Sequence, residues 1–216
     1  MSFRVICISR TAAAGGENVG DSVAQRLGFR YVDEQIIERA AQLAQVDEKL
    51  VAATEHRRPL LQRIVDKLAT AYDLASPVSL ATGVPVDAFI PVPVGYQAIP
   101  EDLRQLIRAA IHEVGQIGQA VIVAHAASMA LAGTPGVLRV LVTASAATRA
   151  QRLAVAQGLS ADAATAAIAK SDRERCDYFR EFYKIKEELP THYDLVINTD
   201  VLTPQQAVEL IVSAAA

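Results

Sequence analysis

The segment of residues 5–20, VICISRTAAAGGENVG, constrains the fold of this chain more than any other part of the sequence. Val5, Ile6 and Ile8 predict a buried strand, a loop of small residues follows, and a helical pattern then begins. A strand that turns through such a loop into a helix is an arrangement that binds phosphate groups, because backbone N–H groups and a helix N-terminus face the anion. We therefore expect a phosphate-binding loop after the first strand.

This loop departs from the phosphate-binding pattern GxxxxGK[ST] at three positions. Arg10 stands at the first glycine of the pattern, Gly16 at its lysine, and Glu17 at its serine or threonine. The ammonium group that normally reaches the β- and γ-phosphates is therefore missing. Arg10 could replace this charge if its side chain folds back over the loop. Glu17 could either bring negative charge to the helix end or help to hold Mg²⁺.

Nearly continuous apolar runs predict the strands of a parallel sheet, because strands covered by helices on both faces need no polar side. The predicted strands are 3–9, 29–32, 119–124, 137–143 and 194–198. Helical patterns separate them, at 17–27, 33–45, 101–117, 145–157, 160–190 and from Thr203 onwards. Strands that alternate with helices predict an α/β layered domain with right-handed crossovers. We expect one domain over residues 1–216.

Residues 59–100 interrupt this alternation. The first part has helical spacing, whereas residues 77–100 contain five prolines among apolar residues. Such a run is too apolar for a solvated linker, so it is an ordered insertion, a substrate-covering arm, a packed loop or a self-association surface. Of these we favour self-association, which would make the protein a homodimer.

Composition limits the class of partner. The net charge is −3, so we expect no broad basic surface for duplex nucleic acid. No run of about 18 apolar residues predicts a membrane span, and no signal-peptide pattern opens the sequence. We therefore expect a cytoplasmic protein. Cys7 and Cys176 are far apart and belong to no metal-binding spacing.

Motifs at both ends of the chain together resemble the cytidylate kinase-like family, relatives of bacterial cytidylate kinase among the P-loop nucleoside-monophosphate kinases. ISRTAAAGGENVG resembles the family's opening ISRxxGSGGxxIG, and GFRYVDEQIIERAA (28–41) resembles its second motif. Four later segments agree in order: AVIVAHAASMAL (120–131), VLRVLVTASAATRAQRL (137–153), SDRERCDYFREFY (171–183) and YDLVINTD (193–200). The resemblance implies a three-layer P-loop NTPase-like fold with a five-stranded parallel sheet, helices on both faces and a helical lid.

The same resemblance implies a phosphotransferase that moves phosphate from ATP to CMP or a related small acceptor, with Mg²⁺. It assigns the nucleotide phosphates to six consecutive residues, namely Ala13, Ala14, Gly15, Gly16, Glu17 and Asn18. It assigns acceptor binding to Asp33 and Arg39, and it places the lid in residues 160–190. It assigns no protein side chain as a metal ligand.

Phosphoryl transfer needs positive charge around the phosphates and little covalent help. Arginines supply such charge through paired hydrogen bonds, and on a lid they do so once water is excluded. The resemblance places Arg173, Arg175 and Arg180 in the family's arginine-bearing lid, and together with Arg10 these are the candidate catalytic residues. Several of the assigned residues also have a purely structural explanation. The lid arginines lie among acidic residues that could pair with them along a helix surface, Arg39 could be a solvated helix residue, and Asp33 could cap the helix that follows it.

Two departures from the family pattern bear on activity. Ala13 and Ala14 replace glycines, and an alanine at position 13 should resist a positive φ and direct a methyl group at the phosphate. In VIVAHAA the family's arginine is absent, which leaves His125 either as an acceptor-binding residue or as a histidine satisfied by the backbone. Each missing charge costs orders of magnitude in rate. The alternative to an active kinase is therefore a catalytically retired nucleotide-binding or regulatory protein, and a purely self-associating structural protein is a third hypothesis.

Overall fold

The computed structural model describes residues 2–33, 101–124 and 126–216. Its five strands form one parallel sheet in the order β2-β3-β1-β4-β5. The strands are β1 (Val5–Arg10), β2 (Arg30–Asp33), β3 (Ala120–Val123), β4 (Val137–Thr143) and β5 (Leu195–Asn198). Each of the five predicted strands is confirmed, with ends that differ by at most two residues.

The helices follow the predicted alternation. They are α1 (Gly16–Leu27), α4 (Glu101–Ile117), α5 (Ala127–Ala130), α6 (Ala146–Gln157), α7 (Ala161–Tyr183), the 3-10 turn η3 (Pro190–His192) and α8 (Pro204–Ala215). The short helix α5 was not expected. The helix predicted over 160–190 ends earlier, at Tyr183, because Lys184 takes a left-handed conformation with φ +57°. The helix predicted over 33–45 and the insertion at 59–100 lie outside the described residues.

Side chains of the loops fix where the later helices begin. The Ser160 hydroxyl accepts a hydrogen bond from the backbone N–H of Ala163 at the start of α7. At α8, Thr203 and Gln206 form a capping box in front of the helix, with Pro204 at its first position. These bonds satisfy N–H groups that have no acceptor within the helix.

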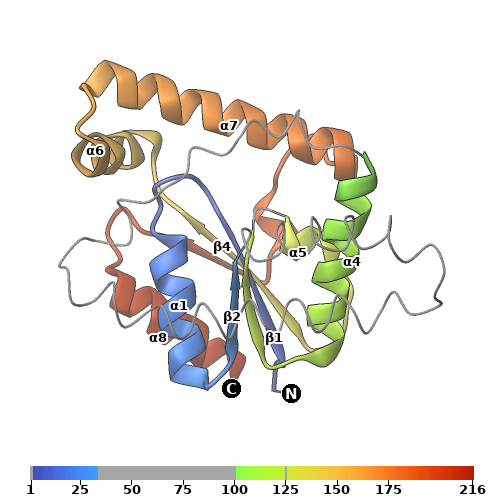
Figure 1. Cartoon of the computed structure of the whole chain (residues 1–216). Helices are drawn as coiled ribbons and strands as arrows, with labels where there is room; N and C mark the ends of the chain where they lie inside the picture. Colours follow the sequence, from blue (N-terminus) through green and yellow to red (C-terminus); the bar gives the residue numbers. More distant parts are fainter. Residues whose placement is uncertain (1, 34–100, 125) are drawn as a thin grey trace, which may run out of the picture.

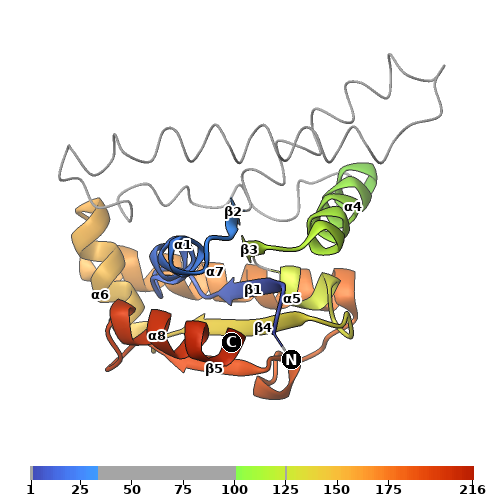
Figure 2. The ribbon, with the colours of Figure 1, turned by 90° about the horizontal axis from the view of Figure 1, so that it is seen from below.

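Helices cover both faces of the sheet, as Figure 2 shows. On one face, Ile6 and Ile8 of β1 are buried with apolar residues of α1 and α8. On the other face, Val5 and Cys7 are buried with apolar residues of α4 and α5. Adjacent residues of β1 thus enter two different cores, which explains why residues 5–8 are all apolar.

Helices α6 and α7 pack against each other, and α7 crosses the edge of the sheet where the strands end (Figure 1). A third apolar cluster joins these helices through Ala150, Leu153, Ala164 and Ile168. At the opposite edge, the N–H of Phe3 donates to the carbonyl of Ala215, 3.2 Å away. Of the helices in the described ranges, none has the length and apolarity needed to cross a membrane.

Candidate functional site

The loop that joins β1 to α1 lies at the carboxyl edge of the sheet and has a left-handed backbone at two positions. Ala13 has φ +61° and Gly15 has φ +80°. Ala13 therefore adopts the conformation that we expected it to resist, at a cost of about 1–2 kcal/mol. Its side chain packs against the apolar cluster of α6 and α7. This contact offsets part of the conformational cost, and it places the Ala13 methyl group against α6 and α7.

The first turn of α1 presents backbone N–H groups to the loop. The first helical bond joins the N–H of Val19 to the carbonyl of Gly15 at 3.2 Å. The N–H groups of Gly16, Glu17 and Asn18 therefore have no acceptor within the helix. Within the described part of the chain, no side chain caps Gly15 either. Together with the positive end of the helix dipole, these amides form an arrangement that suits an anion.

Arg10 ends β1 and lies across the start of α1. Its Nε atom is 2.5 Å from Oε1 of Glu17, and the two side chains are 15% and 32% exposed. A Cβ atom at Gly16 would lie 2.7 Å from the Cβ of Arg10, so only glycine leaves room for this placement. The Arg10 side chain thus lies against the loop, as replacement of the missing lysine would require. Its charge is shared with the carboxylate of Glu17.

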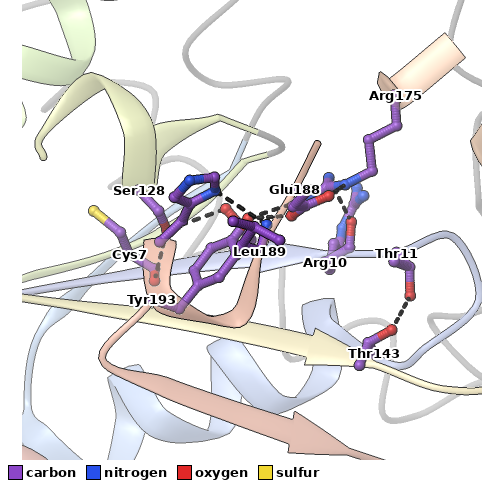
Figure 3. A network of polar contacts seen from close by, with 11 residues as sticks. Cys7, Arg10, Thr11, Ser128, Thr143, Arg175, Glu188, Leu189 and Tyr193 are labelled. Atoms are coloured by element: carbon purple, nitrogen blue, oxygen red, sulfur yellow. Dashed lines mark hydrogen bonds and ion pairs between the residues drawn. The ribbon is translucent and has the colours of Figure 1, made fainter. Parts of the chain in front are cut away.

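Arg175 belongs to a buried polar network that Figure 3 shows. Its guanidinium forms paired hydrogen bonds with the Glu188 carboxylate, at 2.6 and 2.7 Å. It also donates to the carbonyl of Arg10 at 3.0 Å and stacks over the ring of Phe179, 4.6 Å from the ring centre. The explanation that Arg175 pairs along the helix surface is therefore wrong. This guanidinium fastens α7 to the residue that opens the phosphate loop.

Glu188 and Tyr193 complete this network. The Tyr193 hydroxyl donates to Glu188 in a short hydrogen bond. Burial alone would raise the pKa of Glu188, but the hydrogen bonds and charge of Arg175 outweigh it and hold the pKa below its usual value. Burial raises the pKa of Tyr193, which keeps its hydroxyl protonated. The network is thus a carboxylate held between one guanidinium and one phenol.

The two arginines of α6 also bind other parts of the protein. Arg149 is buried, forms two 2.8 Å hydrogen bonds with the carboxylate of Asp172, and so joins α6 to α7. Arg152 donates to the hydroxyl and the carbonyl of Thr199, at 3.0 and 2.6 Å. Arg149 is thus buried between the helices, whereas Arg152 is exposed on α6 and still binds Thr199. Arg149 therefore fixes α6 to α7, and Arg152 fixes α6 to the residue that follows β5.

The remaining predicted residues are more scattered. Arg173 and Arg180 are exposed on α7, and Arg180 forms an ion pair with Asp177 at 3.1 Å. Asp33 ends β2, which β3 separates from β1. Arg39 and His125 lie outside the described residues. The structure thus gathers Arg10, Arg175 and residues 13–18 in one place and leaves Arg173 and Arg180 exposed on α7.

The fit of the site to Mg²⁺ depends on the oxygen ligands that it offers. In the described ranges, no three His, Cys, Asp or Glu side chains come together as a metal-binding group. The carboxylate within the loop is that of Glu17, which is paired with Arg10. Because Mg²⁺ prefers oxygen ligands and keeps several waters, it fits here only with phosphate oxygens supplying much of its coordination.

Comparison with known proteins places this geometry in context. The sequence matches the cytidylate kinase-like family over residues 5–201. No protein of curated function matches the chain in sequence. Among solved structures, an uncharacterised protein from Eubacterium ventriosum has a TM-score of 0.65 and 18% identity, with 98% of this chain and 97% of that chain covered. Shikimate kinase from Bacteroides thetaiotaomicron has a TM-score of 0.48 and 15% identity, with 99% and 98% covered.

Proposed function

The chain belongs to the cytidylate kinase-like family, and from this premise we propose that it transfers a phosphoryl group from ATP to CMP or a related small acceptor. Its fold is the P-loop NTPase-like fold, with a five-stranded parallel sheet between two helical layers (Figure 2), and we assign the lid to residues 160–190. Family and fold together make it a kinase-like nucleotide-binding protein. The observation that supports the proposal most directly is the left-handed turn at residues 13–15, which leads into the open N–H groups of α1 beside Arg10.

The proposed roles follow from this placement. Backbone N–H groups of residues 15–18 hold the donor phosphates, and Arg10 brings positive charge to them. Asp33, Arg39 and His125 bind the acceptor. Arg173 and Arg180 approach the transferred phosphate when the lid rearranges. Arg175 instead positions Arg10 through its hydrogen bond to the Arg10 carbonyl. Mg²⁺, held by the phosphates with Glu17 as the nearby carboxylate, would supply charge neutralisation when bound.

Calorimetry with ATP, ADP and CMP, with and without Mg²⁺, combined with a coupled kinase assay, tests this proposal. We expect ATP binding and measurable ADP formation that depends on the acceptor. Nucleotide binding without turnover would support a catalytically retired, nucleotide-binding protein instead. Absence of nucleotide binding would overturn both versions.

One observation favours the retired protein as a second candidate. Three of the four candidate catalytic arginines already have anionic partners within the protein, since Arg10 pairs with Glu17, Arg175 with Glu188 and Arg180 with Asp177. An active enzyme must redirect at least one of these charges to the phosphates.

The Arg10→Ala variant tests how much the Arg10 guanidinium contributes to ATP affinity. We expect ATP affinity to fall at least about tenfold, since a hydrogen bond to a charged group contributes roughly 1.5–3 kcal/mol. Arg26→Ala is the matched control, because Arg26 is exposed in the last turn of α1, at the end of that helix away from the loop. Equal ATP affinity in both variants would rule out Arg10 as the replacement for the missing lysine.

A further inference from the structure

A single hydroxyl outside the loop contacts the backbone of the loop at its turn. Oγ1 of Thr199 lies 3.0 Å from the carbonyl oxygen of Ala14. Thr199 directly follows β5, 185 residues away in sequence, and both residues are buried. The contact therefore fixes the peptide that joins Ala14 to Gly15, between the two left-handed positions of the turn.

The orientation of this peptide determines where one loop amide points. In a trans peptide the C=O and N–H groups lie on opposite sides. A hydrogen bond that holds the Ala14 carbonyl towards Thr199 therefore turns the N–H of Gly15 away from Thr199. Glycine accepts positive and negative φ about equally, so the backbone at Gly15 does little by itself to prevent a flipped peptide. The hydroxyl of Thr199 supplies that preference.

The neighbours of Thr199 fix the direction of its single proton. Arg152 has only donors, so the Thr199 hydroxyl must accept the 3.0 Å hydrogen bond from Nη1 of Arg152. The proton of the hydroxyl is then left for a carbonyl. The carbonyls of Ala14 and Thr143 lie 3.0 and 3.2 Å from the hydroxyl oxygen, and that of Thr143 already accepts the N–H of Thr199 at 2.8 Å. Arg152 thereby leaves the Thr199 proton available to the loop carbonyl.

We propose that Thr199 is a positioning residue of the phosphate loop, which aims the N–H of Gly15 at a bound phosphate group while Arg152 orients its hydroxyl. The inference rests on the proposed function, because it requires the loop to bind phosphate. It adds a residue that contacts no ligand and carries no charge, and it makes phosphate affinity depend on the residue that follows the last strand.

Inorganic tripolyphosphate is the probe, because it engages the loop without a base or an acceptor. We expect Thr199→Val to weaken tripolyphosphate binding at least about tenfold, and Thr199→Ser to stay within about threefold of the parent protein. Thr165→Val is the matched control, since Thr165 is exposed on α7 and its hydroxyl donates to the carbonyl of Ala161 in the same helix. That control should bind tripolyphosphate like the parent protein.

A second readout separates positioning from plain stability. The amide resonance of Gly15 should shift on tripolyphosphate binding in the parent protein and in Thr199→Ser, but much less in Thr199→Val. A purely structural Thr199 would lower the melting temperature and leave both affinity and shift unchanged, which would overturn the inference. If Thr199→Val does not fold, Arg152→Leu provides the test, with an expected loss of about threefold or more, and parent-like binding would again contradict the inference.

The two proposals fail in different ways. A parent protein that binds neither tripolyphosphate nor ATP would overturn the proposed function and this inference with it. A parent protein that binds tripolyphosphate, together with a folded Thr199→Val that binds it equally well, would overturn only the positioning role.

Discussion

Removal of the Arg175 guanidinium should destabilise the protein far more than removal of an exposed arginine from the same helix. In Arg175→Met the carboxylate of Glu188, which is only 18% exposed, keeps the hydroxyl of Tyr193 but loses its paired hydrogen bonds. Breaking a buried ion pair by removal of one partner costs about 3–5 kcal/mol. Because Glu188 retains some exposure, we expect about 3–4 kcal/mol.

This magnitude can be measured by denaturant and thermal unfolding. For a chain of this length, 1 kcal/mol corresponds to about 2–4 °C in melting temperature, so Arg175→Met should melt roughly 6–16 °C below the parent protein. Arg180→Met is the control, since Arg180 and Asp177 are 61% and 52% exposed. That exposed pair should contribute less than about 0.5 kcal/mol.

A double-mutant cycle isolates the interaction from other effects of the substitution. With Glu188→Gln as the second change, the free energies of unfolding should show a coupling of about 2–3 kcal/mol between Arg175 and Glu188. A coupling below about 0.5 kcal/mol would refute the reasoning. It would show that the network does not fasten α7 to the sheet.

Three further outcomes are expected. Gly16→Ala should cost about 1–3 kcal/mol of unfolding free energy in denaturant titrations, because the new methyl would lie 2.7 Å from the Cβ of Arg10; an unchanged midpoint would contradict this close approach. The native pKa of Glu188 is lowered, so its carboxylate stabilises the folded state fully above the ordinary value of 4.5, and this stabilisation is lost as pH falls below that value. The melting temperature should therefore drop below pH 4.5, and it should drop less in Glu188→Gln. Burial raises the pKa values of Cys7 and Tyr193, so the native state keeps protons that the unfolded chain releases, and stability should fall as pH rises above their ordinary values of 9.0 and 10.0. Between pH 9.0 and 10.0, stability that stays flat in Cys7→Ala but falls in the parent protein would assign the first part of this loss to the thiol, and the later fall should remain in both.

The sequence predicted those parts of the fold that depend on local pattern. The apolar residues of β1 and β4 identified buried parallel strands, and the helical patterns that begin at residue 160 and at Thr203 located the starts of α7 and α8. The glycine-containing turn likewise located the loop, because Gly15 is needed at a positive φ. The end of α7 was placed too late, since the charged pattern continues through Lys184 while the backbone turns there.

The contacts that shape the candidate site could not be predicted, because they join residues with no shared period. Arg175 pairs with Glu188, which lies beyond the end of its helix, whereas local spacing suggested partners within α7. Thr199 reaches Ala14 across almost the whole chain. A hydroxyl or carboxylate at such a distance leaves no signal in hydrophobic periodicity, and only the packed fold brings it to its partner.

The hydrogen bond from Arg175 to the Arg10 carbonyl also has a kinetic consequence. If α7 swings away from the sheet as a unit, the Arg175–Glu188 pair or the bond to Arg10 must break. An opening free energy of about 3 kcal/mol corresponds to roughly one molecule in 150 being open at any moment. Ligand exchange that requires this movement would then depend on rare openings of α7. In an active enzyme, product release and not the chemical step would then limit turnover.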